Sequence, residues 1–462
     1  MPPLASDLVR DAASLRSLIR SIYLQRDDVD RNYRRATVEF LAYITDLGRK
    51  TELYLEKFAS APTDPDPALA AMDRENIASL RSFWFDLHDL VQPSRDADTL
   101  HSPEILISYL EDRLSAIPGL SDCKLLISHT PELNYVQSPR QHLRERADSY
   151  AAIVPGSQKF PAKMALIAIP YSQDENLFSN LIICHEIGHF VFEQLGLEEP
   201  LSGRIENALR NSGPTLSSDD RSWCLERVWA WIEEIFCDRF AIGLIGPAFS
   251  FSYIEMFDVL GIADKDQVND FADTHPSDSC RFLEHFRQLQ ITGWWSLLEQ
   301  RGNTYTKLIR DLSNIPSSRY KFESKGRSRT LANRALKAFG KVRPFVSSLI
   351  AGVFRGRECR FRGGEEMECV RAIEKYLSWG VVPATVIRER VAYQPDPVII
   401  VNAGYLFYLE EISTLIGRIR QSRQEERQPV WQRQRWSQRV EQWTMKAIED
   451  VRLPTNRRPW PT

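Results

Sequence analysis

The stretch "CHEIGHF", residues 184–190, carries two histidines, with a glutamate directly after the first. On an α-helix, His185 and His189 lie one turn apart on the same face, so both imidazole rings can bind a single metal ion. Glu186 lies beside the first ring, where its carboxylate can take a proton from a metal-activated water and pass it to a leaving amine. The spacing therefore predicts a metal-dependent hydrolytic site carried by one helix.

Three features favour a site over a chance match. Histidine accounts for 8 of the 462 residues, so a five-residue pattern of this kind arises by accident in about one chain in a hundred of such composition. The apolar run at 181–184 predicts a buried back for the helix, which would hold the histidines on a fixed element. Gly188 keeps the helix thin beside the metal.

A peptidase-type zinc site needs a third protein ligand and leaves one position for water. The segment "WIEEIFCDRFA", residues 231–241, is predicted to be a helix that carries Glu234 and Asp238 on one face. Carboxylates on an otherwise apolar helix are costly to bury unless they are paired or metal-bound. We therefore expect Glu234 to bind the metal and Asp238 to orient a histidine ring by accepting its hydrogen bond. Glu233 is expected to be a solvated surface charge.

Cysteine is the alternative third ligand, since a deformylase-like site combines two such histidines with a thiolate. The glycine–cysteine turn that precedes the helix in such a site is absent, and Cys184 points about 100° away from His185 around the helix. The available thiols are expected to be small buried hydrophobic groups; they are Cys184, Cys224 and Cys237. The odd total of 7 cysteines, without an export signal, indicates reduced thiols in the cytoplasm.

Together, the "HEIGH" motif and the E-x-x-x-D helix resemble the gluzincin metallopeptidases. A third segment, "THPSDSCRF" at 274–282, resembles the Thr-His-Pro…Arg segment of the HtpX and CAAX-prenyl-protease group. The resemblance implies a Zn2+ site with ligands His185, His189 and Glu234, the base Glu186, and Asp238 as the partner of a ligand. It covers about a third of the chain, residues 150–300, and this sequence lacks the transmembrane segments of that group.

The same resemblance implies roles for two further residues. His275 would lie near the metal, where it stabilises the oxyanion or caps the zinc in a resting state, and Arg281 would be a structural or electrostatic partner beside the site. A structural role for His275 is equally open, because "THPSDS" is also a good capping sequence with Pro276 in the first turn of a helix.

The expected fold is α+β and mostly helical, with a zincin-like catalytic core that holds the active-site helix and a small mixed sheet. Short apolar runs bounded by proline, glycine or serine favour strands at 123–129, 150–156 and 163–170. Elsewhere the apolar residues follow helical spacing. The chain is expected to divide into a helical N-terminal region, the metallopeptidase core and a helical C-terminal region, at residues 1–95, 96–315 and 316–462.

The run "KMALIAIP", residues 163–170, is the candidate for holding substrate. An exposed strand edge binds an extended peptide through main-chain hydrogen bonds, and Pro170 would end the pairing. The alternative is a buried central strand, which the continuous apolar run also permits. Tyr171, next along the chain, can supply a phenolic donor to the substrate.

Composition and charge limit the classes of molecule that the protein is expected to bind. The net charge of −3 indicates no general attraction to nucleic acid or to a membrane surface, and no apolar run reaches the roughly 18 residues that a membrane span requires. The tail interleaves tryptophans with arginines, a pattern that also occurs in single-stranded nucleic-acid binding. Glutamates dilute this charge, so we expect a packed helix instead; the residues are Trp431, Trp436, Trp443, Arg433, Arg435 and Arg439.

These observations predict a soluble, cytoplasmic zinc metallopeptidase that acts on a peptide or protein substrate. Long helical flanks would wall the cleft and restrict the choice of substrate. Two alternatives remain open. The first is a regulatory protein that keeps the zinc fold, has little catalysis and recognises a partner through its flanks. The second is a zinc hydrolase that acts on a non-peptide amide.

Overall fold

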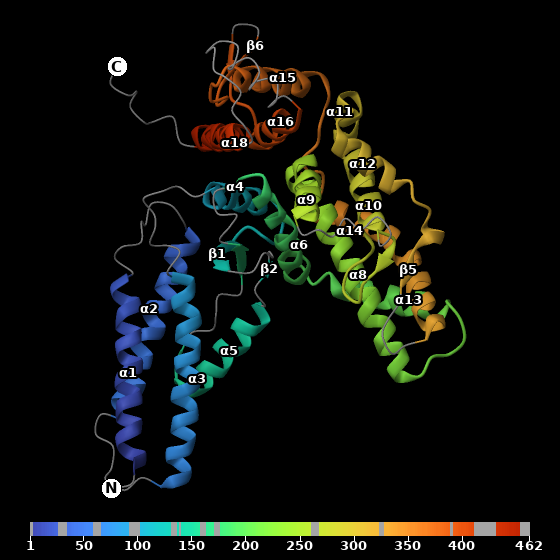
Figure 1. Ribbon diagram of the computed structural model, residues 1–462. Helices are drawn as coiled ribbons and strands as arrows, with labels where there is room; N and C mark the ends of the chain where they lie inside the picture. Colours follow the sequence, from blue (N-terminus) through green and yellow to red (C-terminus); the bar gives the residue numbers. More distant parts are fainter. Residues whose placement is uncertain are drawn as a thin grey trace, which may run out of the picture. The chain divides into compact units, whose positions relative to one another are not determined.

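The computed structural model describes most of the chain, in twelve stretches. These are residues 3–25, 35–58, 66–91, 102–130, 136–137, 140–157, 163–170, 176–259, 268–322, 328–388, 391–410 and 431–452. The protein is mostly helical, as predicted (Figure 1). Within the described residues, no helix is both long enough and apolar enough to cross a membrane.

The chain forms two compact units, and both combine segments that are distant in sequence. The first unit comprises residues 1–101 and 122–172, and the second comprises 102–121 and 173–462. This division does not coincide with the three regions expected from the sequence. Residues 102–121 belong with the second unit, whereas the strands that follow them belong to the first.

The first unit joins four helices to a three-stranded sheet. The helices are α1 (Pro3–Gln25), α2 (Arg35–Glu56), α3 (Pro67–Val91) and α5 (Arg140–Ile153), and the strands are β1 (Lys124–Thr130), β2 (Val136–Gln137) and β3 (Met164–Pro170). The segment 150–156, expected to be a strand, is instead the end of α5 and a turn. Tyr150, on α5, and Val154, directly after the end of that helix, are the two residues of this segment that are buried in the core.

The candidate substrate strand is β3, and it is central in the sheet. The strand order is β1-β3-β2. β1 is parallel to β3 along its whole length, and β2 pairs with it antiparallel at Ile167 and Ala168. The expectation of a free edge is therefore wrong, and the buried alternative holds, because β1 occupies one edge of β3 throughout and β2 occupies the other at Ile167 and Ala168. Tyr171 lies outside the described residues.

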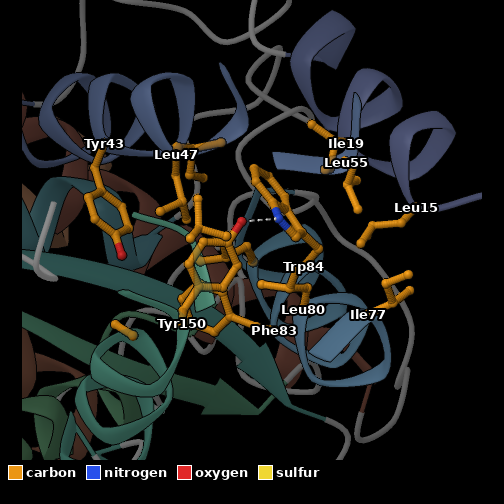
Figure 2. Close-up of a cluster of buried hydrophobic side chains, with 14 of the residues drawn as sticks. Leu15, Ile19, Tyr43, Leu47, Leu55, Ile77, Leu80, Phe83, Trp84 and Tyr150 are labelled. Atoms are coloured by element: carbon orange, nitrogen blue, oxygen red, sulfur yellow. Dashed lines mark hydrogen bonds between the residues drawn. The ribbon is translucent and has the colours of Figure 1, made fainter. Parts of the chain in front are cut away.

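A buried cluster holds the first unit together (Figure 2). Leu15 and Ile19 are four residues apart on α1 and fully buried, as the helical period requires. Trp84 and Tyr150 meet inside the cluster, where the indole N–H donates to the phenol oxygen at 2.8 Å. The hydroxyl of Thr51 also contacts that phenol oxygen. These hydrogen bonds matter because a polar group buried without a partner costs about 1–3 kcal/mol.

The second unit is built almost entirely from helices. Before the long buried helix it contains α4 (Ser102–Ser115), the 3₁₀ turn η4 (Ser179–Ile182), α6 (Ile183–Gln194) and α7 (Glu198–Arg210). The long helix α8 (Ser218–Ile245) is followed by α9 (Pro247–Val259), α10 (Asp278–Ile291), α11 (Trp294–Arg301), α12 (Thr304–Ser313) and η5 (Ser317–Arg319). Then come α13 (Arg329–Val342), η6 (Arg343–Phe345), α14 (Val346–Phe354), α15 (Gly364–Ser378), α16 (Pro397–Glu410) and α18 (Trp431–Arg452).

Two short ladders complete the second unit. β4 (Asp270–Phe271) pairs parallel with β5 (Lys321–Phe322), and β6 (Val386–Arg388) pairs antiparallel with β7 (Val391–Tyr393). The tryptophan-rich tail forms α18, as expected. On it, Trp443 is half-buried and lies against Gly380.

Helix α8 is the central helix of the second unit, and a side-chain hydrogen bond caps its N-terminus. Ser217 is the N-cap and accepts a hydrogen bond from the backbone N–H of Asp220 at 3.2 Å. Acidic residues in the first turn complement the helix dipole. From Ile235 onward the helix is buried on all sides and ends at Gly246, where φ is 76°. A helix that is buried all round requires neighbours on every side, and α6, α10 and α13 are among those that α8 contacts (Figure 1).

Candidate metal centre

The site is formed where α6 crosses α8 at close range. Gly188 makes this possible, because a Cβ at this position would lie 2.7 Å from the Cα of Cys237. The absence of a side chain lets the two backbones approach each other. This brings the motif histidines of α6 opposite the carboxylates of α8.

His185 is buried, and one of its two ring nitrogens contacts Asp238. Its Nδ1 lies 2.9 Å from Asp238 Oδ1. A carboxylate accepts a hydrogen bond from Nδ1–H, and this selects the tautomer whose Nε2 carries the lone pair. That Nε2 lies 3.3 Å from Oε2 of Glu234.

His189 repeats this arrangement with a different pair of carboxylate oxygens. Its Nδ1 lies 2.8 Å from Oε1 of Glu233, and its Nε2 lies 3.5 Å from Oε1 of Glu234. The expectation that Glu233 is a solvated charge is therefore wrong. Its carboxylate is only part-exposed and orients a histidine of the motif, because α8 turns this position towards α6.

The Nε2 atoms of both histidines lie close to the carboxylate of Glu234, each beside a different oxygen. A metal that binds nitrogen and oxygen ligands tetrahedrally at about 2.0–2.1 Å holds those ligand atoms about 3.3 Å apart. The distances from Glu234 to His185 and His189, 3.3 Å and 3.5 Å, are of this size. Glu234 is also buried, and its Oε2 has no hydrogen-bond partner among the described residues. A buried carboxylate oxygen of this kind fits the donor set of a metal site.

Cys237 belongs to the same constellation. One ligand atom from each of His185, His189 and Cys237 lies within 4.8 Å of the others, so this buried group can hold a metal ion. Burial first, and the nearby carboxylates second, raise the pKa of the Cys237 thiol well above its usual range. The sequence predicts that this thiol is a small buried hydrophobic group. It is fully buried, as expected, but it is buried against the histidines.

Arg281, on α10, forms ion pairs with two carboxylates of α8. Its Nε and Nη2 donate to the two oxygens of Asp238 at 2.7 Å and 2.6 Å, which is a bidentate ion pair. Its Nη1 lies 3.3 Å from Oε2 of Glu234. Burial alone would raise the pKa of Asp238, but the guanidinium holds that pKa well below its usual range. Asp238 therefore stays ionised and continues to accept from His185.

Two residues that the sequence analysis did not identify complete this network. His285, one turn after Arg281 on α10, is fully buried, and its Nε2 lies 3.4 Å from Oδ2 of Asp238. Burial lowers its pKa, which favours the neutral ring. The ring of Tyr253 lies 4.5 Å from the Cζ of Arg281, a cation–π contact. The sequence signal for His285 is its position four residues after Arg281, which places both side chains on one face of a helix.

His275 lies at the rim of the site and is exposed. Its Nε2 is 3.8 Å from Oε1 of Glu234, and its Nδ1 is 2.7 Å from Oγ1 of Thr274. Helix α10 begins at Asp278, so Pro276 precedes the N-cap and does not lie in the first turn. Glu186 is half-buried on α6, at the position directly after His185.

Ion pairs link the histidines and carboxylates of the site. Burial alone would lower the pKa of His185, but Glu234 and Asp238 raise it to about 10. Burial alone would raise the pKa of Glu234, but His185 and Arg281 lower it to about 2. A protonated His185 therefore faces an ionised Glu234, so a metal ion must displace a proton from the ring before it can bind there.

The chain was compared with protein-family models, with curated proteins and with solved structures, and no match was found in any of the three. Any functional assignment therefore depends on the site itself: the buried histidine pair, the carboxylates of α8 and the adjacent thiol.

Proposed function

We propose that this protein is a zinc-dependent peptidase with a gluzincin-type site on a zincin-like core. One observation carries the proposal. Each motif histidine gives its Nδ1 to a separate carboxylate, and each directs its Nε2 to the buried carboxylate of Glu234, at 3.3 Å and 3.5 Å. Histidine ligands whose second nitrogen is held by a carboxylate are typical of metal sites.

The donor set fits zinc. His185, His189 and Glu234 would hold the ion and leave a position for water, the arrangement of catalytic sites that bind zinc through two histidines and a glutamate. When bound, zinc would lower the pKa of water towards neutrality and polarise a substrate carbonyl. Magnesium and calcium prefer all-oxygen sites, so two imidazoles argue against them.

The chain's own residues then have distinct roles. Glu186, adjacent to His185, would take the proton of the attacking water and deliver it to the leaving amine. With zinc bound, Asp238 and Glu233 would accept from Nδ1–H of the two rings and leave each Nε2 free for the ion. Arg281 keeps Asp238 ionised. His275, exposed at the rim and 3.8 Å from Glu234, is positioned to donate to the oxyanion of the substrate.

The catalytic part of the proposal is tested by Glu186→Gln. This variant should retain zinc and lose cleavage of a peptide library by about 100-fold or more, because general-base catalysis contributes about 10²–10⁴-fold. Glu193→Gln, which changes an exposed carboxylate on the same helix, is the matched control and should keep full activity. Full turnover by a zinc-loaded Glu186→Gln protein would refute the assigned mechanism.

The identity of the third ligand needs its own test, because Glu234 and Cys237 both lie near the histidines. Glu234 is favoured, since its oxygens lie 3.3 Å and 3.5 Å from the Nε2 atoms of His185 and His189, the spacing of two ligands on one ion. Cobalt substitution separates the two, because a cobalt–thiolate bond gives a strong near-ultraviolet charge-transfer band. We expect no such band, loss of metal in Glu234→Ala, and retention of metal in Cys237→Ala.

A second function is favoured by the group that includes Cys237. If the thiolate joined both histidines and Glu234, four protein ligands would close the site, as in structural zinc sites. The protein would then be a zinc-stabilised binding protein with little catalysis. A thiolate band in the cobalt form, together with metal loss in Cys237→Ala and no cleavage of any library peptide, would establish this function in place of the first.

A further inference from the structure

A half-open cavity lies in the same unit as the metal centre but shares no residue with it. Its volume is about 500 Å³, within the range of small-molecule sites. Its walls come from the end of α4, the segment that joins α14 to α15, and the first turn of α16. The lining combines an apolar floor with charges of both signs.

The floor is apolar and well packed. Ile117, Leu244, Phe354 and Val398 line it, and each is almost completely buried. Leu244 lies on α8, and the ring of Phe354 packs onto Gly243 of the same helix, where a Cβ would lie 2.6 Å from that ring. A ligand in this cavity would therefore rest an apolar group on the C-terminal end of α8.

Arginines supply the positive charge. Arg113 donates to the backbone oxygen of Arg357 at 3.2 Å, and Arg357 donates to the backbone oxygen of Ala116. These contacts position the guanidinium groups without neutralising them, since the acceptors are carbonyls. Arg362 also lines the cavity. Within the described part of the chain, none of the three arginines forms an ion pair with a carboxylate, and three such groups can bind a carboxylate ligand bidentately.

Glu358 supplies a buried carboxylate that is ion-paired with Arg360 but has one oxygen without a hydrogen-bond donor. Its side chain is only 4% exposed, and its Oε2 lies 3.5 Å from Nη2 of Arg360. That oxygen accepts no hydrogen bond from any described residue. The other two carboxylates of the lining are already used locally, because Asp396 accepts from the backbone N–H of Val398 at 2.8 Å and Glu366 accepts from that of Arg362. A buried carboxylate oxygen without a donor favours a ligand that carries an N–H group.

The cavity wall is preformed. The backbone N–H of Cys359 donates to the oxygen of Gly243 at 2.7 Å, and the indole of Trp294 donates to the oxygen of Cys359 at 3.1 Å. The N–H of Phe361 donates to the oxygen of Thr292 at 2.8 Å. These bonds tie the charged segment to α8 and to the end of α10, so little ordering would be needed on binding.

We propose that this cavity binds a small zwitterion with an apolar side chain, namely an apolar α-amino acid or a short peptide of such residues. The carboxylate would face Arg113, Arg357 and Arg362, the ammonium group would donate to Glu358, and the side chain would lie on the apolar floor. An anion alone would leave Oε2 of Glu358 without a hydrogen-bond donor, and a cation alone would leave the arginines without a carboxylate partner.

The test is isothermal titration calorimetry of the full-length protein with four probes. L-Leucine and the dipeptide Leu-Leu carry both charges, whereas 4-methylpentanoate lacks the ammonium group and isopentylamine lacks the carboxylate. We expect one-to-one binding of leucine or Leu-Leu, and the tighter of the two identifies the ligand class. Each single-charge analogue should bind at least tenfold more weakly. Equal binding of all four probes, or of none, overturns the proposal.

Substitutions of residues that line the cavity test whether the ligand binds there. Arg362→Gln and Glu358→Gln should each weaken binding of the better probe by about tenfold, the effect of removing one charged partner. Arg371→Gln and Glu199→Gln, which change exposed side chains outside the cavity, should leave it unchanged. Arg362 is exposed, so this variant reports on binding even if Glu358→Gln unfolds. Unchanged binding in Arg362→Gln refutes the site. Glu186→Gln should bind normally, so a failure here is distinct from a failure of the proposed catalysis.

Discussion

Gly188 of α6 lies directly on the backbone of Cys237 of α8, so close that a Cβ on residue 188 would be 2.7 Å from the Cα of Cys237. This contact fixes how near the motif helix comes to the helix with the carboxylates. Gly188 has no side chain that could bind a metal or transfer a proton. Its role is to let the two helices approach, so the contact affects the distance between the histidines and Glu234.

Gly188→Ala should therefore damage the site without touching a ligand. The added methyl group forces the helices apart, which we expect to cost about 1–3 kcal/mol of unfolding free energy, as overpacking does, and to weaken zinc binding. Gly203→Ala, in a helical position where a Cβ meets nothing within 4 Å, should be neutral or stabilising by up to about 1 kcal/mol. Urea denaturation and metal analysis of both variants check this. Equal stabilities would contradict the close contact.

Glu233→Gln should weaken metal binding although Glu233 is not a proposed ligand. Its Oε1 holds Nδ1 of His189 at 2.8 Å, and loss of such a partner costs about 10–100-fold in metal affinity. Competition with a chromophoric chelator measures the affinity. Glu226→Gln, which changes a more exposed carboxylate on the same helix, should bind zinc like the wild type. If Glu233→Gln also did so, Glu233 would have no part in orienting the ring.

Arg281→Met should destabilise the whole second unit. The substitution leaves Asp238, which is fully buried, without its bidentate partner. Removal of one member of a buried ion pair costs about 3–5 kcal/mol. Arg287→Met, on the same helix but with a partly exposed side chain, should cost clearly less. Chemical denaturation monitored by circular dichroism compares them, and similar losses in both would argue against a structural role for the Arg281–Asp238 pair.

Zinc binding should release a proton near pH 7. Glu234 and Asp238 overcome the effect of burial and raise the pKa of His185 to about 10 in the metal-free protein, so the ring is protonated until a metal displaces the proton. The apparent affinity should fall by about tenfold for each pH unit below that pKa. Calorimetric titrations in two buffers with different ionisation enthalpies count the protons. Binding without proton release would contradict the protonated His185.

Stability should also fall as the pH rises because of Glu441. Burial raises the pKa of this α18 carboxyl to about 8, although the backbone N–H groups of Phe178 and Leu177 oppose the shift. In the unfolded chain a glutamate titrates near 4.3. Between these values the folded state binds more protons, so the free energy of unfolding decreases as the pH rises from about 4.3 to about 8 and then levels off. Thermal melts of the wild type across this pH range should show the decrease in stability. In Glu441→Gln, stability should depend less steeply on pH. An identical slope in Glu441→Gln would exclude this carboxyl as the cause.

The sequence by itself determined the parts of the site that lie within single helices. His185 and His189 share a face because of their spacing of four, and the same holds for Glu234 and Asp238, so the structure brings together groups whose order along each helix was already readable. The mostly helical class followed from the same periodicity. The role of each residue in catalysis stays a prediction.

Only the tertiary structure decided which residues meet across helices. Glu233 faces His189, Cys237 lies beside the ligand rings, and His285 reaches Asp238 from a third helix. β3 became a central strand for the same reason, since its partners come from elsewhere in the chain. Spacing along one element fixes a face, but the rotation and distance between two elements depend on how side chains pack between them, and here the contact of Gly188 with Cys237 sets both.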